Sequence, residues 1–169
     1  ENNIKFIKAS ATHLPFEDEN FSHIISQSTI YHIHDKKKAL SEIFRVLQKG
    51  GIFVFDDLIK PQSEIGSDTK KYVYERLMFD TPYSFETFQD ELKKQGFIVL
   101  EAIDESDNLK KTYQKLSKIL EKKIEQKENL EFHERYRFLI TGYKKTIEAV
   151  DKKEVGWAIY VCRKPFSIR

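Results

Sequence analysis

Several residue types are scarce in these 169 residues, and each scarcity excludes a class of protein. The one cysteine, Cys162, excludes an internal disulfide and any metal site built from several thiolates, and it fits a reducing compartment. The longest apolar run, near 51–55, is far below the roughly 20 residues that cross a bilayer. The net charge of +2 is too small to indicate a nucleic-acid or membrane surface. These features favour a soluble, cytoplasmic protein that binds a small molecule or another protein.

Glycine is also scarce, and no two of the six glycines form a G-x-G pattern. The sequence therefore lacks the glycine-rich turn through which backbone NH groups usually approach a nucleotide cofactor. Metal ligands are equally sparse. The segment 32–35 (His-Ile-His-Asp) stands alone, without the further clustered ligands that a complete site needs, so we expect no bound metal.

The first third of the chain has the pattern of an α/β protein. Apolar runs at 4–9 and 21–26 predict two buried strands, separated by turn-forming residues. Asp35 is the expected N-cap of a helix whose apolar residues recur at helical spacing until Gly50 stops it. The apolar run 51–55 then predicts a strand covered by helices on both faces. A strand, a helix and a strand in this order predict a parallel crossover.

The remaining pattern adds one more unit and then changes. Residues 84–94 predict a helix capped by Ser84, and 97–100 predict another strand. From 105 to 151, two stripes of apolar residues at helical spacing predict amphipathic helices that fold back on each other as an αα-hairpin. Residues 157–162, rich in β-branched and aromatic side chains, predict a last, antiparallel strand.

An ordered set of short motifs resembles a known family. The motifs are Leu14-Pro15-Phe16, Asn20-Phe21, Ser26-Gln27, His32, Arg45-Val46-Leu47 and Gly50-Gly51, followed downstream by Tyr74-Glu75-Arg76 and the ending from Gly156-Trp157 to Arg163-Lys164. The first group resembles class I S-adenosyl-L-methionine (SAM)-dependent methyltransferases, and the downstream group is similar to sarcosine and dimethylglycine N-methyltransferases. The resemblance implies an α/β, Rossmann-like methyltransferase doubly wound sheet with strands three to seven present and the helical hairpin 105–151 inserted as a lid.

The same resemblance implies that residues 1–169 form a single incomplete methyltransferase domain. In that family the strand corresponding to 4–9 reaches the others only through two earlier strands, which this sequence does not contain. Unpaired buried strand amides cost on the order of 1–3 kcal/mol each. We therefore expect the missing strands to come from an upstream segment, from a partner chain or from a homo-oligomer.

The resemblance also implies SAM as cofactor and places it on particular residues. The adenine would lie at Ser10 and Ala11, and the methyl-donating end at Gln27, Ser28 and His32. Serine stands at positions 10, 22 and 28, where the family usually or often carries an acidic residue. A serine hydroxyl still accepts a hydrogen bond, without the strength of a carboxylate. Ordinary drift in an active enzyme and degeneration of the cofactor site both remain open.

Tyr31 and His32 are the candidate catalytic residues. Methyl transfer depends mainly on positioning and desolvation, and His32 could accept the proton that leaves the amine. A histidine packed at a strand-to-helix junction is the alternative. Tyr31, Tyr83 and Tyr143, with Tyr136, could bind the substrate by enclosing a methylated ammonium through cation–π contacts. The same spacing of tyrosines also suits simple core packing.

Three functions are compatible with these features. The first is an enzyme, completed by its missing N-terminal segment, that transfers methyl from SAM to a small-molecule amine such as sarcosine or dimethylglycine. The second is a non-catalytic methyltransferase-like subunit or interaction scaffold that has lost SAM binding. The third keeps the fold but takes a lipid head group, a quinone precursor or a macromolecule as acceptor.

Overall fold

The computed structural model describes residues 3–62, 64–127 and 130–167. The main elements, in chain order, are β1 (Phe21–Gln27), α1 (Lys36–Val46), β2 (Leu47–Ile59), α3 (Phe85–Lys94), β3 (Ile98–Asp104), α4 (Ser106–Glu125), α5 (His133–Asp151) and β4 (Gly156–Arg163). Four short helical segments complete the chain: η1 (Ile30–His32), α2 (Ser67–Thr69), η2 (Lys70–Glu75) and η3 (Leu130–Phe132).

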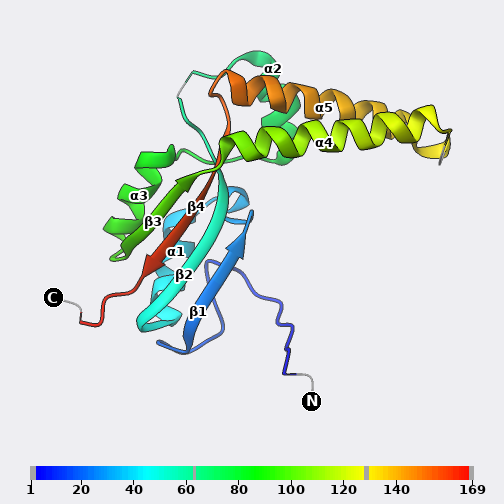
Figure 1. Ribbon diagram of the computed structural model, residues 1–169. Coiled ribbons are helices and arrows are strands. Elements are labelled where there is room, and N and C mark those ends of the chain that lie inside the picture. The colour runs from blue at the N-terminus through cyan, green and yellow to red at the C-terminus, as the bar shows by residue number, and fades with distance from the viewer. Residues whose placement is uncertain (1–2, 63, 128–129, 168–169) are drawn as a thin grey trace.

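The four strands form one sheet in the order β1-β2-β4-β3 (Figure 1). β1 pairs with β2 in parallel, as the strand–helix–strand pattern predicts. β4 lies between β2 and β3 and runs antiparallel to both, so the predicted last antiparallel strand is confirmed. The α/β fold class is therefore confirmed, with β2 extending beyond both ends of the predicted run 51–55.

The predicted strand at 4–9 is wrong. Residues 3–9 adopt no regular secondary structure, and the ring of Phe6 is 96% exposed. Figure 1 shows this segment running away from the sheet at the N-terminal end. An apolar run becomes a strand only where a neighbour accepts its backbone hydrogen bonds. β1 occupies the edge of the sheet, and no described strand lies beyond it.

Helix α1 begins as predicted and ends earlier. The side chain of Asp35 accepts a hydrogen bond of 2.9 Å from the backbone NH of Lys38, which confirms it as the N-cap. The helix ends at Val46, and Gly50, with φ of +75°, lies within β2 instead of stopping the helix. The buried ammonium of Lys164 donates to the carbonyls of Phe44 and Leu47 at 2.9 and 2.8 Å. A positive charge thus stabilises the C-terminal end of the helix.

We expect Lys164→Met to lower the free energy of unfolding by about 1–3 kcal/mol, because two carbonyls would lose their charged donor. Lys49→Met is the matched control, since the Lys49 side chain is exposed and its nearest carboxylate, Glu19, is 3.9 Å away. This second change should stay within about 0.5 kcal/mol of the native protein. Urea unfolding monitored by circular dichroism measures both, and equal effects of the two variants would contradict the capping role.

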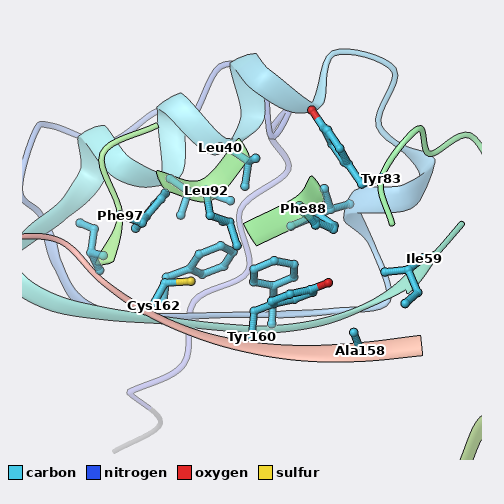
Figure 2. Close-up of a cluster of buried hydrophobic side chains, with 14 residues drawn as sticks. Leu40, Ile59, Tyr83, Phe88, Leu92, Phe97, Ala158, Tyr160 and Cys162 are labelled. Atoms are coloured by element: carbon cyan, nitrogen blue, oxygen red, sulfur yellow. The ribbon is translucent and has the colours of Figure 1, made fainter. Parts of the chain in front are cut away.

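One face of the sheet carries the main core. Helices α1 and α3 pack there, and Figure 2 shows Phe88, Tyr160 and their neighbours interleaved between these helices and the strands. Helix α3 begins at Ser84, whose side chain and that of Thr87 form a reciprocal capping box. The fully buried large side chains of this cluster include Ile30, Leu40, Leu47, Phe53, Phe55, Ile59, Phe88, Leu92 and Tyr160.

The opposite face of the sheet is bare. Side chains alternate between faces along a strand, so Ile25 and Val54, which are in register, point away from the main core. Ile25 is 80% exposed, and in Figure 1 no described helix lies in front of the strands. Sheets built on parallel pairing are normally covered on both faces. Within the described residues, neither this face nor the outer edge of β1 has a helix or strand packed on it.

The predicted αα-hairpin is confirmed as a structural element. α4 and α5 run antiparallel and project beyond the end of the sheet (Figure 1). Their base is joined to the sheet by a second buried cluster, formed by Tyr31, Leu58, Val73, Phe79, Leu109, Ala149, Val150 and Val155. None of the helices in the described residues is both long and apolar enough to span a membrane.

Candidate functional site

The predicted site residues Gln27 and Ser28 lie where β1 ends. Ser28 adopts a left-handed backbone conformation with φ of +46°, which few non-glycine residues tolerate without compensating contacts. Its backbone NH is shared between the carbonyl and the side chain of Asp56, at 3.0 and 3.1 Å, and its hydroxyl donates to Asp56 Oδ1 at 2.7 Å. The indole NH of Trp157 donates to the same oxygen at 3.1 Å. Asp56 therefore fixes the turn after β1.

Tyr31 and His32 follow this turn in the segment η1, with their ring centroids 3.8 Å apart. The Nδ1 atom of His32 lies 3.3 Å from the carbonyl oxygen of Met78. Because a carbonyl can only accept, Nδ1 carries the proton in this contact. In the neutral ring Nε2 then has the free lone pair, as a general base requires. His32 is exposed, so this atom is accessible to a ligand.

Tyr31 is buried beside His32 and keeps its phenolic proton. Burial raises its pKa above the usual value, the negative charge of Asp57 and the phenol of Tyr113 raise it further, and Arg76 lowers it. A tyrosine with a raised pKa acts near neutral pH as a hydrogen-bond donor and an apolar surface. The same interactions show that Asp57, Tyr113 and Arg76 lie within electrostatic reach of Tyr31.

Arg76 joins Tyr143 to this region. Its guanidinium lies 5.5 Å from the ring centroids of both Tyr113 and Tyr143, which are themselves 5.2 Å apart. Nη2 donates to the hydroxyl of Thr146 at 2.9 Å. Gly142 permits this approach, because a Cβ atom there would lie 2.7 Å from Nε of the arginine. The hairpin therefore holds a cation against two adjoining aromatic rings.

The other predicted tyrosines lie elsewhere. Tyr83 packs 4.7 Å from Phe88 in the main core, where burial raises its pKa to about 12. Tyr136 lies beside Phe132, 6.3 Å between ring centroids, near the start of α5. The structure thus connects Tyr31 to Tyr143 through Tyr113 and Arg76, and it does not assemble the four predicted tyrosines into one cage.

Ser10 and Ala11 form a separate loop. The hydroxyl of Ser10 contacts that of Thr12 at 2.8 Å, and its carbonyl accepts from the backbone NH of His13 at 3.0 Å. The loop that follows is anchored to α1 by Arg45, which donates to the carbonyls of Leu14 and Phe16 at 3.0 and 2.7 Å. Between the described residues, no hydrogen bond connects Ser10 or Ala11 to the turn after β1.

Asp57, which was not among the predicted site residues, is fully buried near the end of β2. Within the described part of the chain neither carboxylate oxygen of Asp57 accepts a well-formed hydrogen bond. The backbone NH groups of Leu58 and Tyr31 nevertheless lie near enough to lower the pKa of Asp57 in part. Burial dominates and raises the pKa of Asp57 to about 8, helped by the charge of Asp56 and opposed by Lys36. The available signal was an acidic pair inside the apolar run that forms β2.

Of the predicted residues, Gln27, Ser28, Tyr31 and His32 lie together at the end of β1, the edge strand of the sheet. A cleft of about 470 Å³ lies instead between the sheet, α3 and the hairpin base, lined by Ile59, Phe85, Asp104, Ser106 and Val150. It contains none of the predicted site residues. Among the described residues, no group of three or more His, Cys, Asp or Glu side chains could hold a metal ion.

The α/β sheet, with its last antiparallel strand between two others, has the fold of the Rossmann-like methyltransferases, as the structural likeness shows. Residues 1–55 match the family model described as a methyltransferase domain. The structure superposes on Haemonchus contortus phosphoethanolamine N-methyltransferase 2, solved with phosphomonomethylethanolamine and S-adenosylhomocysteine (SAH), with a TM-score of 0.82 and 23% identity over 92% of this chain and 36% of that one.

Two curated relatives match nearly the whole chain. Phosphoethanolamine N-methyltransferase 1 of Zea mays is 26% identical over 161 residues, covering 95% of this chain and 32% of its own length. The glycine/sarcosine/dimethylglycine N-methyltransferase of Actinopolyspora halophila is 24% identical over 163 residues, covering 96% and 29%. The chain thus resembles class I SAM-dependent methyltransferases of these kinds, and it spans about a third of the length of these relatives.

Proposed function

We propose that this chain is part of an enzyme that transfers a methyl group from SAM to the nitrogen of a small amine carrying an anionic group. The observation that supports this proposal most is the arrangement of Tyr31 and His32 directly after β1, with Arg76 held against the rings of Tyr113 and Tyr143. Ligands of open α/β sheets bind at the carboxyl ends of parallel strands. The relatives supply the reaction class, since two of them are named for N-methylation of small amines.

The predicted cofactor residues of this chain could contact part of SAM. Ser28 offers its oxygen lone pairs at the end of β1 while its own proton is bound to Asp56, and Gln27 lies beside it. Ser10 and Ala11 would take the adenine in a separate loop. When bound, SAM supplies an electrophilic methyl group. The glycine-rich turn for its methionine portion would come from a further segment of the protein, and the bare face and the free edge of β1 supply the surface for that segment.

The protein's own residues supply proton transfer and orientation. Transfer forms a carbon–nitrogen bond, breaks a carbon–sulfur bond and requires a proton to leave the acceptor nitrogen. His32 accepts this proton at Nε2, while its Nδ1 stays bonded to the carbonyl of Met78. Tyr31 packs against the imidazole and limits the access of water.

Arg76 and the hairpin would set acceptor specificity. The guanidinium lies against Tyr113, which packs on the buried cluster that contains Tyr31, and a carboxylate or phosphate on the acceptor would pair with it. The hairpin α4–α5 carries Tyr113 and Tyr143, so its movement as a lid would close the acceptor site and order these side chains.

A methylation assay with the longest native form of the protein tests this proposal. We expect transfer from SAM to ethanolamine phosphate, sarcosine or dimethylglycine, and at least about tenfold lower kcat/KM for ethanolamine, which lacks the anion. Transfer to none of these amines by a protein that binds SAM would refute the proposed acceptor class. Failure to bind SAM at all would favour a non-catalytic, methyltransferase-like subunit.

A further inference from the structure

We infer that Asp56 is a positioning residue that supplies negative charge to the methyl-donor end of the site through Ser28. This inference rests on the proposed function, because it concerns how the donor is held. Asp56 lies within β2, in register with Gln27 of β1. Its side chain is therefore next to the turn where the donor and acceptor would meet.

The hydrogen bonds to Asp56 converge on a single oxygen. The hydroxyl of Ser28, the backbone NH of Ser28 and the indole NH of Trp157 all donate to Oδ1. In the described part of the chain Oδ2 accepts no hydrogen bond. Since the Ser28 hydroxyl gives its proton to a carboxylate, its lone pairs point away from Asp56 and become more negative. The serine thus passes charge from β2 to the turn.

This arrangement also replaces an acid that the sequence lacks. Position 28 is a serine where the resemblance led us to expect an aspartate, yet a carboxylate stands one hydrogen bond away, 2.7 Å from the Ser28 hydroxyl. Asp56 is only half-buried, and the adjacent sheet face is apolar and uncovered. Once that face is covered, the local dielectric falls and the charge acts more strongly on a nearby cation.

The donor and its product allow the charge to be tested directly. SAM carries a sulfonium, whereas SAH is a neutral thioether of nearly the same shape. A purely structural Asp56 would support both ligands equally, because it would only hold the turn. A charged Asp56 would favour SAM alone, so the ratio of the two affinities separates the roles.

The test uses Asp56→Asn in the longest native protein, with SAM and SAH binding measured by calorimetry. The asparagine oxygen can still accept from Ser28 and Trp157, but the charge is lost. We expect the affinity for SAM to fall about tenfold or more, while the affinity for SAH changes less than about twofold. Asp90→Asn, an exposed acid on α3 paired with Lys93, is the control and should alter neither affinity.

The fluorescence of Trp157, the one tryptophan of these 169 residues, shows whether the turn held by Asp56 stays in place, because its indole donates to that carboxylate. If the turn stays in place, Asp56→Asn should leave the emission spectrum of Trp157 unchanged. Any other tryptophans in the longest native protein would be replaced for this measurement. Equal losses for SAM and SAH, or no loss for either, would overturn the inference and leave Asp56 a structural clamp. If the unmodified protein binds neither ligand, the proposed function fails first and the inference falls with it.

Discussion

Replacing His32 with alanine should lower kcat/KM for methyl transfer by about 10²–10⁴-fold, the range for removal of a positioned general base. His32 offers a free Nε2 because its Nδ1 is bound to the carbonyl of Met78. The affinity for SAH should change little, since the base acts on the nitrogen of the acceptor and not on the cofactor. Rates with saturating SAM and calorimetry with SAH measure the two effects separately.

His34→Ala provides a matched control for this variant. His34 lies two residues away, its side chain is fully exposed, and it contacts the carboxylate of Asp80 at 3.3 Å. This change should leave kcat/KM within about twofold, as expected for a surface position. Equal losses in the two variants, or full activity of His32→Ala, would show that His32 only packs at the strand-to-helix junction.

Replacing Asp57 with asparagine should remove a large pH dependence of stability. The pKa of Asp57 is raised from 3.8 to about 8 by burial, so the folded protein holds a proton that the unfolded chain releases. Its contribution is fully present below about pH 4 and is lost as the pH rises through about 8. At about 1.36 kcal/mol per pKa unit, this displacement corresponds to roughly 6 kcal/mol at most.

Chemical unfolding between pH 5 and pH 9 measures this effect. The unmodified protein should lose stability across the range, and Asp57→Asn should show a flatter profile and exceed it near pH 9. Glu101→Gln, an exposed carboxylate on the neighbouring strand β3, should follow the unmodified profile. Parallel profiles for the native protein and Asp57→Asn would mean that the buried carboxyl is ionised throughout and has partners that the structure does not show.

The helices that neighbouring residues specify by themselves could be predicted from the sequence. Helical spacing and the caps Asp35 and Ser84 located α1 and α3, and two apolar stripes located the hairpin. The segment 4–9 failed because strand formation depends on a neighbour, which no local pattern reveals. The end of α1 was misplaced for a similar reason, since Lys164, more than a hundred residues away, caps it.

The site was predictable only in part, because its contacts join distant segments. Tyr31 and His32 were found through their position after β1. Arg76 belongs to a sequence motif, but its contact with Tyr113 and Tyr143 depends on the fold, which brings three distant segments together. Asp56 follows the apolar run of β2, where no local pattern marks it as a site residue. Only the register of β2 with β1 shows that Asp56 holds the turn at Ser28.

We propose above that this chain carries the residues that contact the methyl-donating end of SAM in a methyltransferase. Calorimetric titration of SAH into these 169 residues and into the longest native form of the protein tests it most directly. The account predicts a dissociation constant on the order of micromolar, about −8 kcal/mol, for the long form, with much weaker binding by the shorter chain alone. No binding by the long form would contradict the account and leave a methyltransferase-like fold without its cofactor.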